Sequence, residues 1–252
     1  MAVIAAVFAI VATMTNCDKD GDDGQNGDGI YRPKKRISAI YTSSSHSPTK
    51  TLYQKWVWGE KDLEKITCHY EGEMYRTITF LYRNNKGQLL EIKNPESSDD
   101  VNNVKYRYKN SKISGIDFLG EGVVYYSLEV LETKNGKITK VAVYEDGDKE
   151  GEGTYIYSKN NLVTRTVNDS GNTETTTYQY DNKNNPFHNF FRMMPPFIME
   201  TDLDALLYSK NNCIVDAYGT TIEYKYDGDW PIEKKEIYSN GGYYIEYYEY
   251  EN

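Results

Sequence analysis

Polar and apolar residues alternate along most of the chain from residue 36 onward. The segments 104–108, 138–143 and 221–226 show the pattern clearly, because side chains of one kind stand at every second position. A period of two residues is typical of β-strands with one buried face and one face in water. About 16 such segments follow one another up to residue 250, nearly all joined by short loops, so the sequence predicts an all-β antiparallel meander.

Turn-forming residues recur at a fixed interval. Turn segments begin at residues 59, 84, 109, 134 and 158, so successive starts are 25, 25, 25 and 24 residues apart. A fixed period predicts repeated units, and here the unit is a long hairpin with its return loop. Asn135-Gly136 and Asn240-Gly241 fit two-residue turns in which both residues have positive φ.

One segment departs from this interval, namely residues 186–208, which concentrate aromatic residues and three methionines. It is interrupted by Pro195-Pro196 and then predicts a short helix that buries Leu203, Leu206 and Leu207. We expect a hydrophobic cap that closes one end of the sheet. The alternative is a lid that faces lipid or a partner protein.

The two faces of the strands decide what kind of sheet to expect. Many strands carry tyrosine on one face and lysine, arginine or glutamate along the other. A transmembrane barrel instead needs an apolar band facing lipid. The pattern therefore favours a strongly curved sheet or a soluble barrel outside the membrane.

The first residues indicate export. Residues 2–14 are uncharged and almost wholly apolar, which is the length of a signal-peptide core and too short to span a bilayer. The following Met14-Thr15-Asn16-Cys17 resembles a bacterial lipobox, which implies a diacylglyceryl group on the Cys17 thiol. The acidic residues after Cys17 resemble the surface-export signal of Bacteroidetes lipoproteins. The alternative is an ordinary cleaved secretory peptide with an incidental cysteine.

Charge and composition divide the rest of the chain. The protein has 29 Lys and Arg against 38 Asp and Glu, a formal charge of −9, which argues against a nucleic-acid partner. Residues 18–29 carry five Asp, one Lys and four Gly without an apolar side chain, as expected of a flexible tether. The expected organisation is a lipoprotein signal peptide at 1–16, an acidic tether at 17–29 and a single β-meander domain at 30–252.

Tyrosine is unusually frequent, with 25 residues. Most are expected to stabilise the sheet, because a tyrosine ring can be buried while its hydroxyl reaches the rim. An exposed row of rings, with Trp56, Trp58 or Trp230, would instead offer flat faces for stacking on sugars.

Two segments resemble known repeats. Residues 80–90 (FLYRNNKGQLL) and 178–184 (YQYDNKN) look like units of the Tyr-Asp (YD, Rhs-type) hairpin repeat. Residues 180–187 (YDNKNNPF), followed by 209–212 (SKNN), resemble a family of uncharacterised Bacteroidetes lipoproteins with a domain of unknown function. The resemblance covers roughly residues 36–250 and implies a porin-like, many-stranded β fold and an envelope location. It supplies no catalytic or ligand residues.

Catalytic and metal motifs are not evident in the sequence. His46, His69 and His188 lie far apart, and neither a zinc motif nor a nucleophile elbow occurs. Residues 146–151 begin like a calcium loop but fit a polar hairpin tip better. Cys68 and Cys213 are expected to pack as small apolar side chains, with a disulfide between them as the alternative. We therefore expect no enzyme activity, with a hydrolase as the alternative, and no cofactor or metal.

Location and composition together favour a non-catalytic binding module. The expected protein is an outer-membrane lipoprotein exposed at the cell surface, held to the membrane by its N-terminal lipid and binding a glycan or another polymer. Two alternatives remain open: a structural or assembly protein of the envelope, acting through residues 190–199, and a carrier whose curved sheet encloses a lipophilic ligand.

Overall fold

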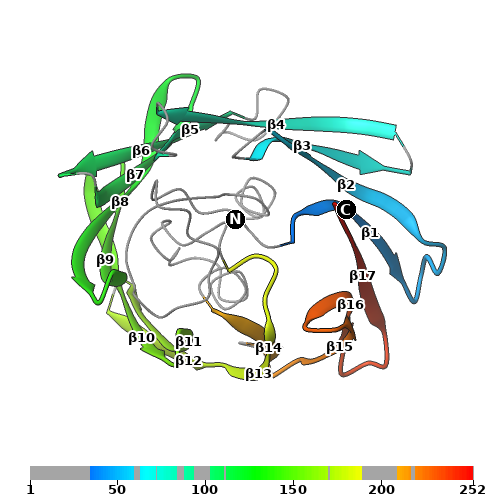
Figure 1. Ribbon diagram of the computed structural model, residues 1–252. Coiled ribbons are helices and arrows are strands. Elements are labelled where there is room, and N and C mark those ends of the chain that lie inside the picture. The colour runs from blue at the N-terminus through cyan, green and yellow to red at the C-terminus, as the bar shows by residue number, and fades with distance from the viewer. Residues whose placement is uncertain are drawn as a thin grey trace.

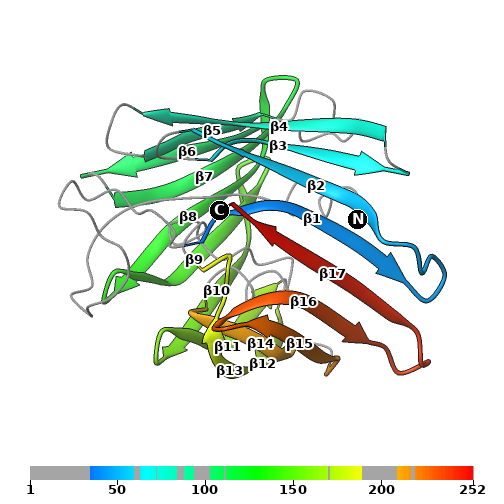
Figure 2. The same cartoon turned by 45° about the vertical axis from the view of Figure 1, so that its right-hand side comes forward.

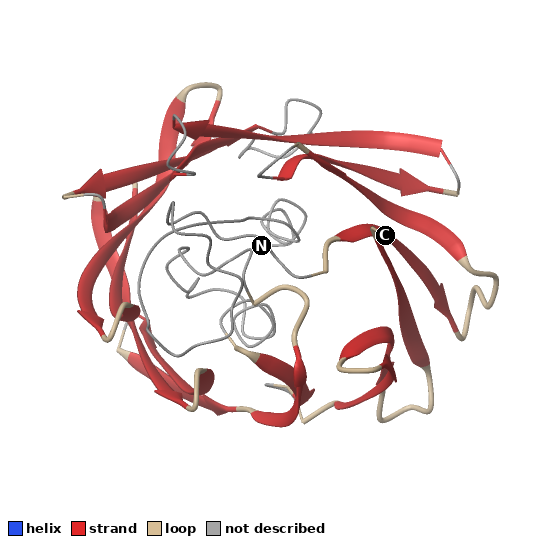
Figure 3. Cartoon of the chain, in the orientation of Figure 1, coloured by secondary structure: helices blue, strands red, loops and turns tan. Residues whose placement is uncertain are grey.

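The computed structural model describes residues 35–59, 63–71, 73–83, 88–93, 103–110, 112–169, 171–188, 209–216 and 219–251. These residues form 17 strands and no helix (Figure 3). The strands are β1 (Ile37–Ser44), β2 (Thr51–Trp58), β3 (Leu63–Tyr70), β4 (Glu73–Arg83), β5 (Gln88–Lys93), β6 (Asn103–Lys109), β7 (Lys112–Gly120), β8 (Val123–Lys134), β9 (Lys137–Glu145), β10 (Asp148–Ser158), β11 (Asn161–Asp169), β12 (Asn172–Thr177), β13 (Gln179–Asn184), β14 (Asn211–Val215), β15 (Thr221–Asp227), β16 (Trp230–Ile237) and β17 (Tyr243–Tyr250).

The strands follow one another around a nearly closed barrel (Figure 1). Every strand pair with a defined register is antiparallel, and β1 pairs with both β2 and β17, which closes the ring. The weakest junction is β14–β15, where only Val215 and Thr221 are in register. The predicted antiparallel meander is confirmed, with 17 strands instead of about 16.

The apolar face of the sheet points into the barrel. Side chains from strands all around the ring belong to one hydrophobic cluster. Phe187, which follows β13, makes ring contacts with Trp56 on β2 at 6.1 Å and with Tyr248 on β17 at 5.8 Å. Because a residue after β13 meets two strands elsewhere in the ring, these side chains share an interior (Figure 1).

The opposite face, on the outside of the barrel, carries charged cross-strand pairs. Arg107 contacts Asp117 at 3.1 Å, and Lys140 contacts Glu152 at 2.5 Å. The predicted division into an apolar and a polar face is therefore present, with the polar face outward. Among the described residues, no helix combines the length and the apolar character needed to cross a bilayer.

Neighbouring strands are antiparallel with one exception: β13 continues β12 in the same direction along β11, since the Tyr178 amide between them donates to the Val163 carbonyl. All other successive connections therefore alternate between the two ends of the barrel. The turns β1–β2, β3–β4 and β16–β17 lie together at one end, which we call the far end (Figure 2). The turns β6–β7, β8–β9 and β10–β11 lie at the other, which we call the repeat end. The turn segments with the 25-residue interval all join strands at the repeat end, so one interval is one full hairpin.

At the repeat end the same local irregularity recurs. A β-bulge precedes the turn in six hairpins, and five of the six bulges carry an aromatic residue. The bulges are Val57/Trp58, Leu81/Tyr82, Arg107/Tyr108, Glu132/Thr133, Ile156/Tyr157 and Lys225/Tyr226. A bulge bends a strand and increases its twist, so its repetition curves the sheet into a ring.

The two predicted Asn-Gly turns differ. Asn135 and Gly136 have φ of 52° and 74°, as predicted for a turn with two positive angles. At Asn240-Gly241 only Gly241 has positive φ, and the Asn240 side chain accepts a hydrogen bond from the Gly242 amide. That prediction is wrong because the asparagine side chain supports a different turn.

Two parts of the sequence interpretation lie outside the described residues. Residues 186–188 form a turn after β13, but the predicted short helix and the segment 190–199 fall beyond it. The signal peptide, Cys17 and the acidic tether are also outside the described residues.

Candidate functional site

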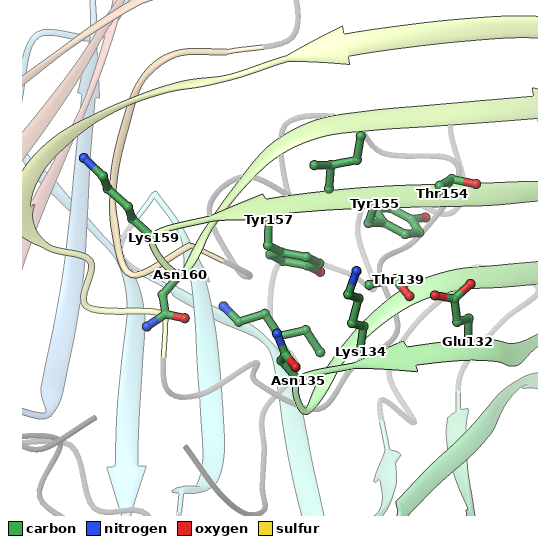
Figure 4. A pocket seen from close by; sticks show the side chains of 11 residues that line it. Glu132, Lys134, Asn135, Thr139, Thr154, Tyr155, Tyr157, Lys159 and Asn160 are labelled. Carbon is green, nitrogen blue, oxygen red and sulfur yellow. The ribbon is translucent and has the colours of Figure 1, made fainter. Parts of the chain in front are cut away.

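A cleft opens at the repeat end where two hairpins separate. β9 and β10 are paired up to Lys140 and Thr154, and beyond that pair each strand continues only with its own hairpin partner. The cleft has a volume of about 610 Å³ (Figure 4). We call it the β9–β10 notch, lined by Glu132, Lys134, Asn135, Lys137, Thr139, Thr154, Tyr155, Ile156, Tyr157, Lys159 and Asn160.

The notch combines positive charge with aromatic surface. Three lysines line it against a single carboxylate, that of Glu132. Lys137 Nζ lies 4.9 Å from the centre of the Tyr157 ring, within the range of a cation–π interaction. The Thr139 hydroxyl is buried and makes no hydrogen bond to another described residue. The arrangement suits a ligand that bears negative charge and hydroxyl groups.

Two tight turns place the lysines around the notch. Lys159 and Asn160, between β10 and β11, both have positive φ, 48° and 66°. Lys134 and Lys137 flank the Asn135-Gly136 turn and are directly opposite each other in register. Figure 4 shows Lys134 and Lys159 on the two sides of Tyr157.

An asparagine-rich junction fixes one wall of the notch. The Lys210 amide donates to the Asn160 carbonyl at 3.0 Å. The side chains of Asn161 and Asn211 are joined by a hydrogen bond of 3.1 Å, and Asn161 also accepts from the Asn211 amide at 2.9 Å. The two SKNN segments, 158–161 and 209–212, are therefore held together, and the position of Lys159 is defined by residues about fifty positions away.

The Tyr180-Asp181 pair contributes to the same region. Asp181 accepts hydrogen bonds from the Lys183 and Asn212 amides and from the Tyr226 hydroxyl. Burial, followed by the hydrogen bond to Asp181, raises the pKa of Tyr226. The contacts with Asn212 and Tyr226 join β13 to β14 and β15, so the carboxylate of Asp181 acts in the wall of the barrel.

A second charged cluster lies inside the wall formed by β15–β17. Lys234 is buried and contacts Glu236 at 2.6 Å and Glu246 at 3.7 Å. The Tyr248 hydroxyl donates to Glu246 at 2.6 Å. Burial lowers the pKa of Lys234, but Glu246 and Glu236 outweigh it, and the pKa is raised overall. The amine therefore stays charged, and the cluster is internally satisfied.

The three tryptophans predicted as ligand residues are placed differently. Trp56 is 3% exposed and its indole donates to Gln54, so it offers almost no ring surface to a ligand. Trp58 stacks on Trp56 at 6.4 Å and donates to the Ile37 carbonyl. Trp230 instead packs edge-on against Tyr250 at 6.2 Å. The structure thus brings Trp56 and Trp58 together in packing contacts.

The two cysteines considered as a disulfide pair are buried in the packing of the barrel. Cys68 and Cys213 are both buried and free, so the alternative of a disulfide between them is not realised. Burial raises the pKa of the Cys68 thiol to about 11. Within the described part of the chain, no group of three metal-ligating side chains is assembled.

Sequence reasoning missed the notch lysines. The segments 134–137 and 158–161 were recognised as turns, and their lysines were assigned no role. A usable signal was present, since lysine recurs beside the turns that follow the 25-residue interval, at Lys109, Lys134 and Lys159.

Comparison with known proteins bears on the fold. A scan of protein families and a search of curated proteins gave no match. Among solved structures, the chain is similar to a porin-like protein from Bacteroides uniformis, with a TM-score of 0.53 and 12% identity over 85% of this chain and 98% of that one. The two share a fold. A porin-like protein from Bacteroides vulgatus gives a TM-score of 0.49 at 10% identity over 86% of this chain and 99% of that one. The similarity to the Bacteroides uniformis protein supports the porin-like β fold implied by the sequence resemblance.

Proposed function

We propose that the protein is a non-catalytic binding module of a bacterial cell envelope and that the β9–β10 notch binds a negatively charged glycan segment. The observation that carries this proposal is the set of three lysines around the Tyr157 ring. Lysine amines pair with carboxylate or phosphate groups, and tyrosine rings pack on sugar C–H surfaces. The asparagine and threonine side chains of the notch supply further hydrogen bonds.

The envelope location rests on the N-terminal sequence and on the outer wall of the barrel. Acylation of Cys17 with two or three chains is a lasting anchor, since each buried methylene contributes about 0.8 kcal/mol. The outward cross-strand pairs, such as Arg107–Asp117 and Lys225–Glu233, suit water. A lysine or arginine on a lipid-facing wall costs roughly 2–4 kcal/mol at mid-membrane. These features support a barrel that is tethered to a membrane and stands outside it.

The test is a glycan screen with the full-length chain carrying Cys17→Ser, which cannot be acylated. We expect retention of glycans that carry uronic-acid or phosphate groups, weaker retention in high salt, and no retention of their neutral counterparts. Failure of every anionic glycan to bind would overturn the proposal.

Paired substitutions locate the site. Lys134→Gln with Lys159→Gln should weaken glycan binding about tenfold or more, because the two lost charged contacts are together worth at least about 1.4 kcal/mol. The matched control is Lys109→Gln with Lys112→Gln, which removes the same charge from the neighbouring β6–β7 turn. Equal losses in the two double variants would show that the notch is not the binding site.

A second candidate function, envelope assembly through protein contacts, is favoured by one surface feature. Tyr70 and Met74, on either side of the β3–β4 turn, are 69% and 58% exposed, and the neighbouring Tyr75 is also exposed. Exposed apolar groups of this kind occur at protein interfaces. Cross-linking in cells from a photoreactive residue at position 74 would identify a partner, and a lack of cross-linked products would argue against assembly at this turn.

A further inference from the structure

In the part of the chain that the structure describes, the two ends of the barrel differ in charge. At the far end, the turns and the strand residues next to them bear mainly carboxylates, at Glu71, Glu73, Glu121, Glu145, Asp146, Asp148, Asp169 and Asp216. At the repeat end, three successive hairpins and the start of β14 bear lysines. We call this set the basic arc: Lys109, Lys112, Lys134, Lys137, Lys159 and Lys210.

Five of the six lysines of the basic arc are not neutralised by described neighbours. Two other cations of the repeat end are paired, Lys35 with Asp227 and Lys183 with Asp229. In contrast, Lys109, Lys112, Lys134, Lys159 and Lys210 make no ion pair in the described part of the chain, and all five are exposed. Their charge therefore acts on whatever approaches this end.

The positions of these lysines lower the stability of the folded hairpins. Lys109 is directly opposite Lys112 in register, and Lys134 is directly opposite Lys137. Like charges directly opposite each other on neighbouring strands repel and destabilise a hairpin. Two successive hairpins with the same unfavourable pair indicate that the positive charge serves an external partner.

The repeat end is also where the chain arrives from its N-terminal side. β1 begins at this end, and Arg36 contacts Glu251 there at 3.8 Å, next to the end of β17. Seventeen residues, 18–34, separate Cys17 from the first described residue. Even fully extended, a segment of this length spans at most about 60 Å. An acyl group on Cys17 would therefore keep the barrel near the membrane, with the repeat end nearest the attachment.

We propose that the basic arc docks the repeat end of the barrel onto the phosphate-bearing headgroups of an anionic lipid surface. Of the proposed function, the docking proposal rests on the acyl anchor at Cys17 and on nothing else. The field of an anionic surface decays over about 8 Å at physiological salt, so it acts on one end of the barrel at a time. It attracts the basic arc and repels the acidic far end, which sets the orientation of the anchored domain.

The test measures co-sedimentation of the full-length Cys17→Ser chain with lipid vesicles. One vesicle preparation contains phosphatidylcholine with about a quarter phosphatidylglycerol, and the other contains phosphatidylcholine alone. We expect binding to the first preparation only, with a steep decrease as salt rises. Equal binding to both preparations, or no binding to the anionic vesicles at low salt, would overturn the proposal.

Matched triple variants test which surface docks. Lys109→Gln, Lys112→Gln and Lys210→Gln together should reduce vesicle binding about 100-fold, because each lysine near an anionic surface contributes roughly a fivefold gain. The control removes three exposed lysines from the outer wall of the barrel, Lys55, Lys65 and Lys105, each replaced by Gln. We expect a change of less than about threefold for the control.

Further readouts separate this proposal from the proposed function. The arc variant keeps Lys134, Lys137 and Lys159, so its glycan binding should be unchanged while its vesicle binding is lost. Its thermal stability should equal or exceed that of the parent, because the repulsion between Lys109 and Lys112 is relieved. Equal loss of vesicle binding in the arc and wall variants would refute docking through the repeat end. Mass spectrometry of the mature N-terminus tests the acyl anchor independently of either binding assay.

Discussion

At the residue scale, aromatic side chains join neighbouring hairpins where backbone pairing has ended. The Tyr108 hydroxyl donates to the Leu89 carbonyl at 2.7 Å, although β5 and β6 are in register only up to Glu91 and Lys105. The same kind of bond links Tyr250 to the Pro231 carbonyl at 2.6 Å. These bonds account for part of the high tyrosine content, because each replaces a missing step of the ladder.

The bond predicts a measurable loss of stability. Tyr108→Phe keeps the ring but removes the donor, and it should lower the free energy of unfolding by about 1 kcal/mol, since the Leu89 carbonyl loses its partner. Urea denaturation followed by circular dichroism measures the change. Tyr70→Phe is the matched control, because Tyr70 is 69% exposed, and it should change the stability by less than about 0.5 kcal/mol. Equal effects of the two substitutions would show that the hydroxyl bond adds nothing.

At the element scale, the last two strands, β16 and β17, are joined through a buried amine. Lys234 on β16 bridges Glu236 on its own strand and Glu246 on β17. Lys234→Met should lower the free energy of unfolding by about 3 kcal/mol, because it leaves carboxylates in the wall without a counter-charge. Adding Glu246→Gln to this variant should recover part of the loss, and chemical denaturation of the single and double variants measures the coupling. An additive double variant would mean that the two residues act independently.

The same scale shows what the sequence could and could not predict. Alternation was sufficient to predict the strands, because each residue on a strand lies on one of two faces. The notch was not predictable, because it depends on where the pairing of β9 with β10 ends, at Lys140 and Thr154, and local composition does not encode that register. Trp56 and Trp58 show the complementary case: their aromatic character suggested a ligand surface, and the structure places the two rings in packing contact with each other.

At the scale of the whole molecule, the interior contains many tyrosines whose ionisation is suppressed. Burial, followed by the charges of Tyr75, Cys68 and Glu246, raises the pKa of Tyr53 to about 12. Burial is also the largest cause of the raised pKa of Tyr224 and Tyr248, which are well above the ordinary value. The folded barrel therefore resists deprotonation at a pH at which an unfolded chain, with tyrosine pKa near 10, begins to ionise.

The sign of the resulting pH dependence follows from this difference. A tyrosine whose folded pKa exceeds its unfolded pKa contributes stability that is complete below about pH 10 and is lost as pH rises toward the folded value. Each such residue should lower the free energy of unfolding by about 1.4 kcal/mol per pH unit above pH 10. Lys234 acts in the same direction, because its pKa is also raised.

Urea denaturation at pH 7, 8, 10 and 11, with tyrosinate absorbance recorded in parallel, measures the effect of pH on the free energy of unfolding. We expect little change between pH 7 and 8, a steep loss above pH 10, and a tyrosinate signal that rises together with unfolding. Complete tyrosine ionisation in the folded protein near pH 10 would contradict a packed aromatic interior.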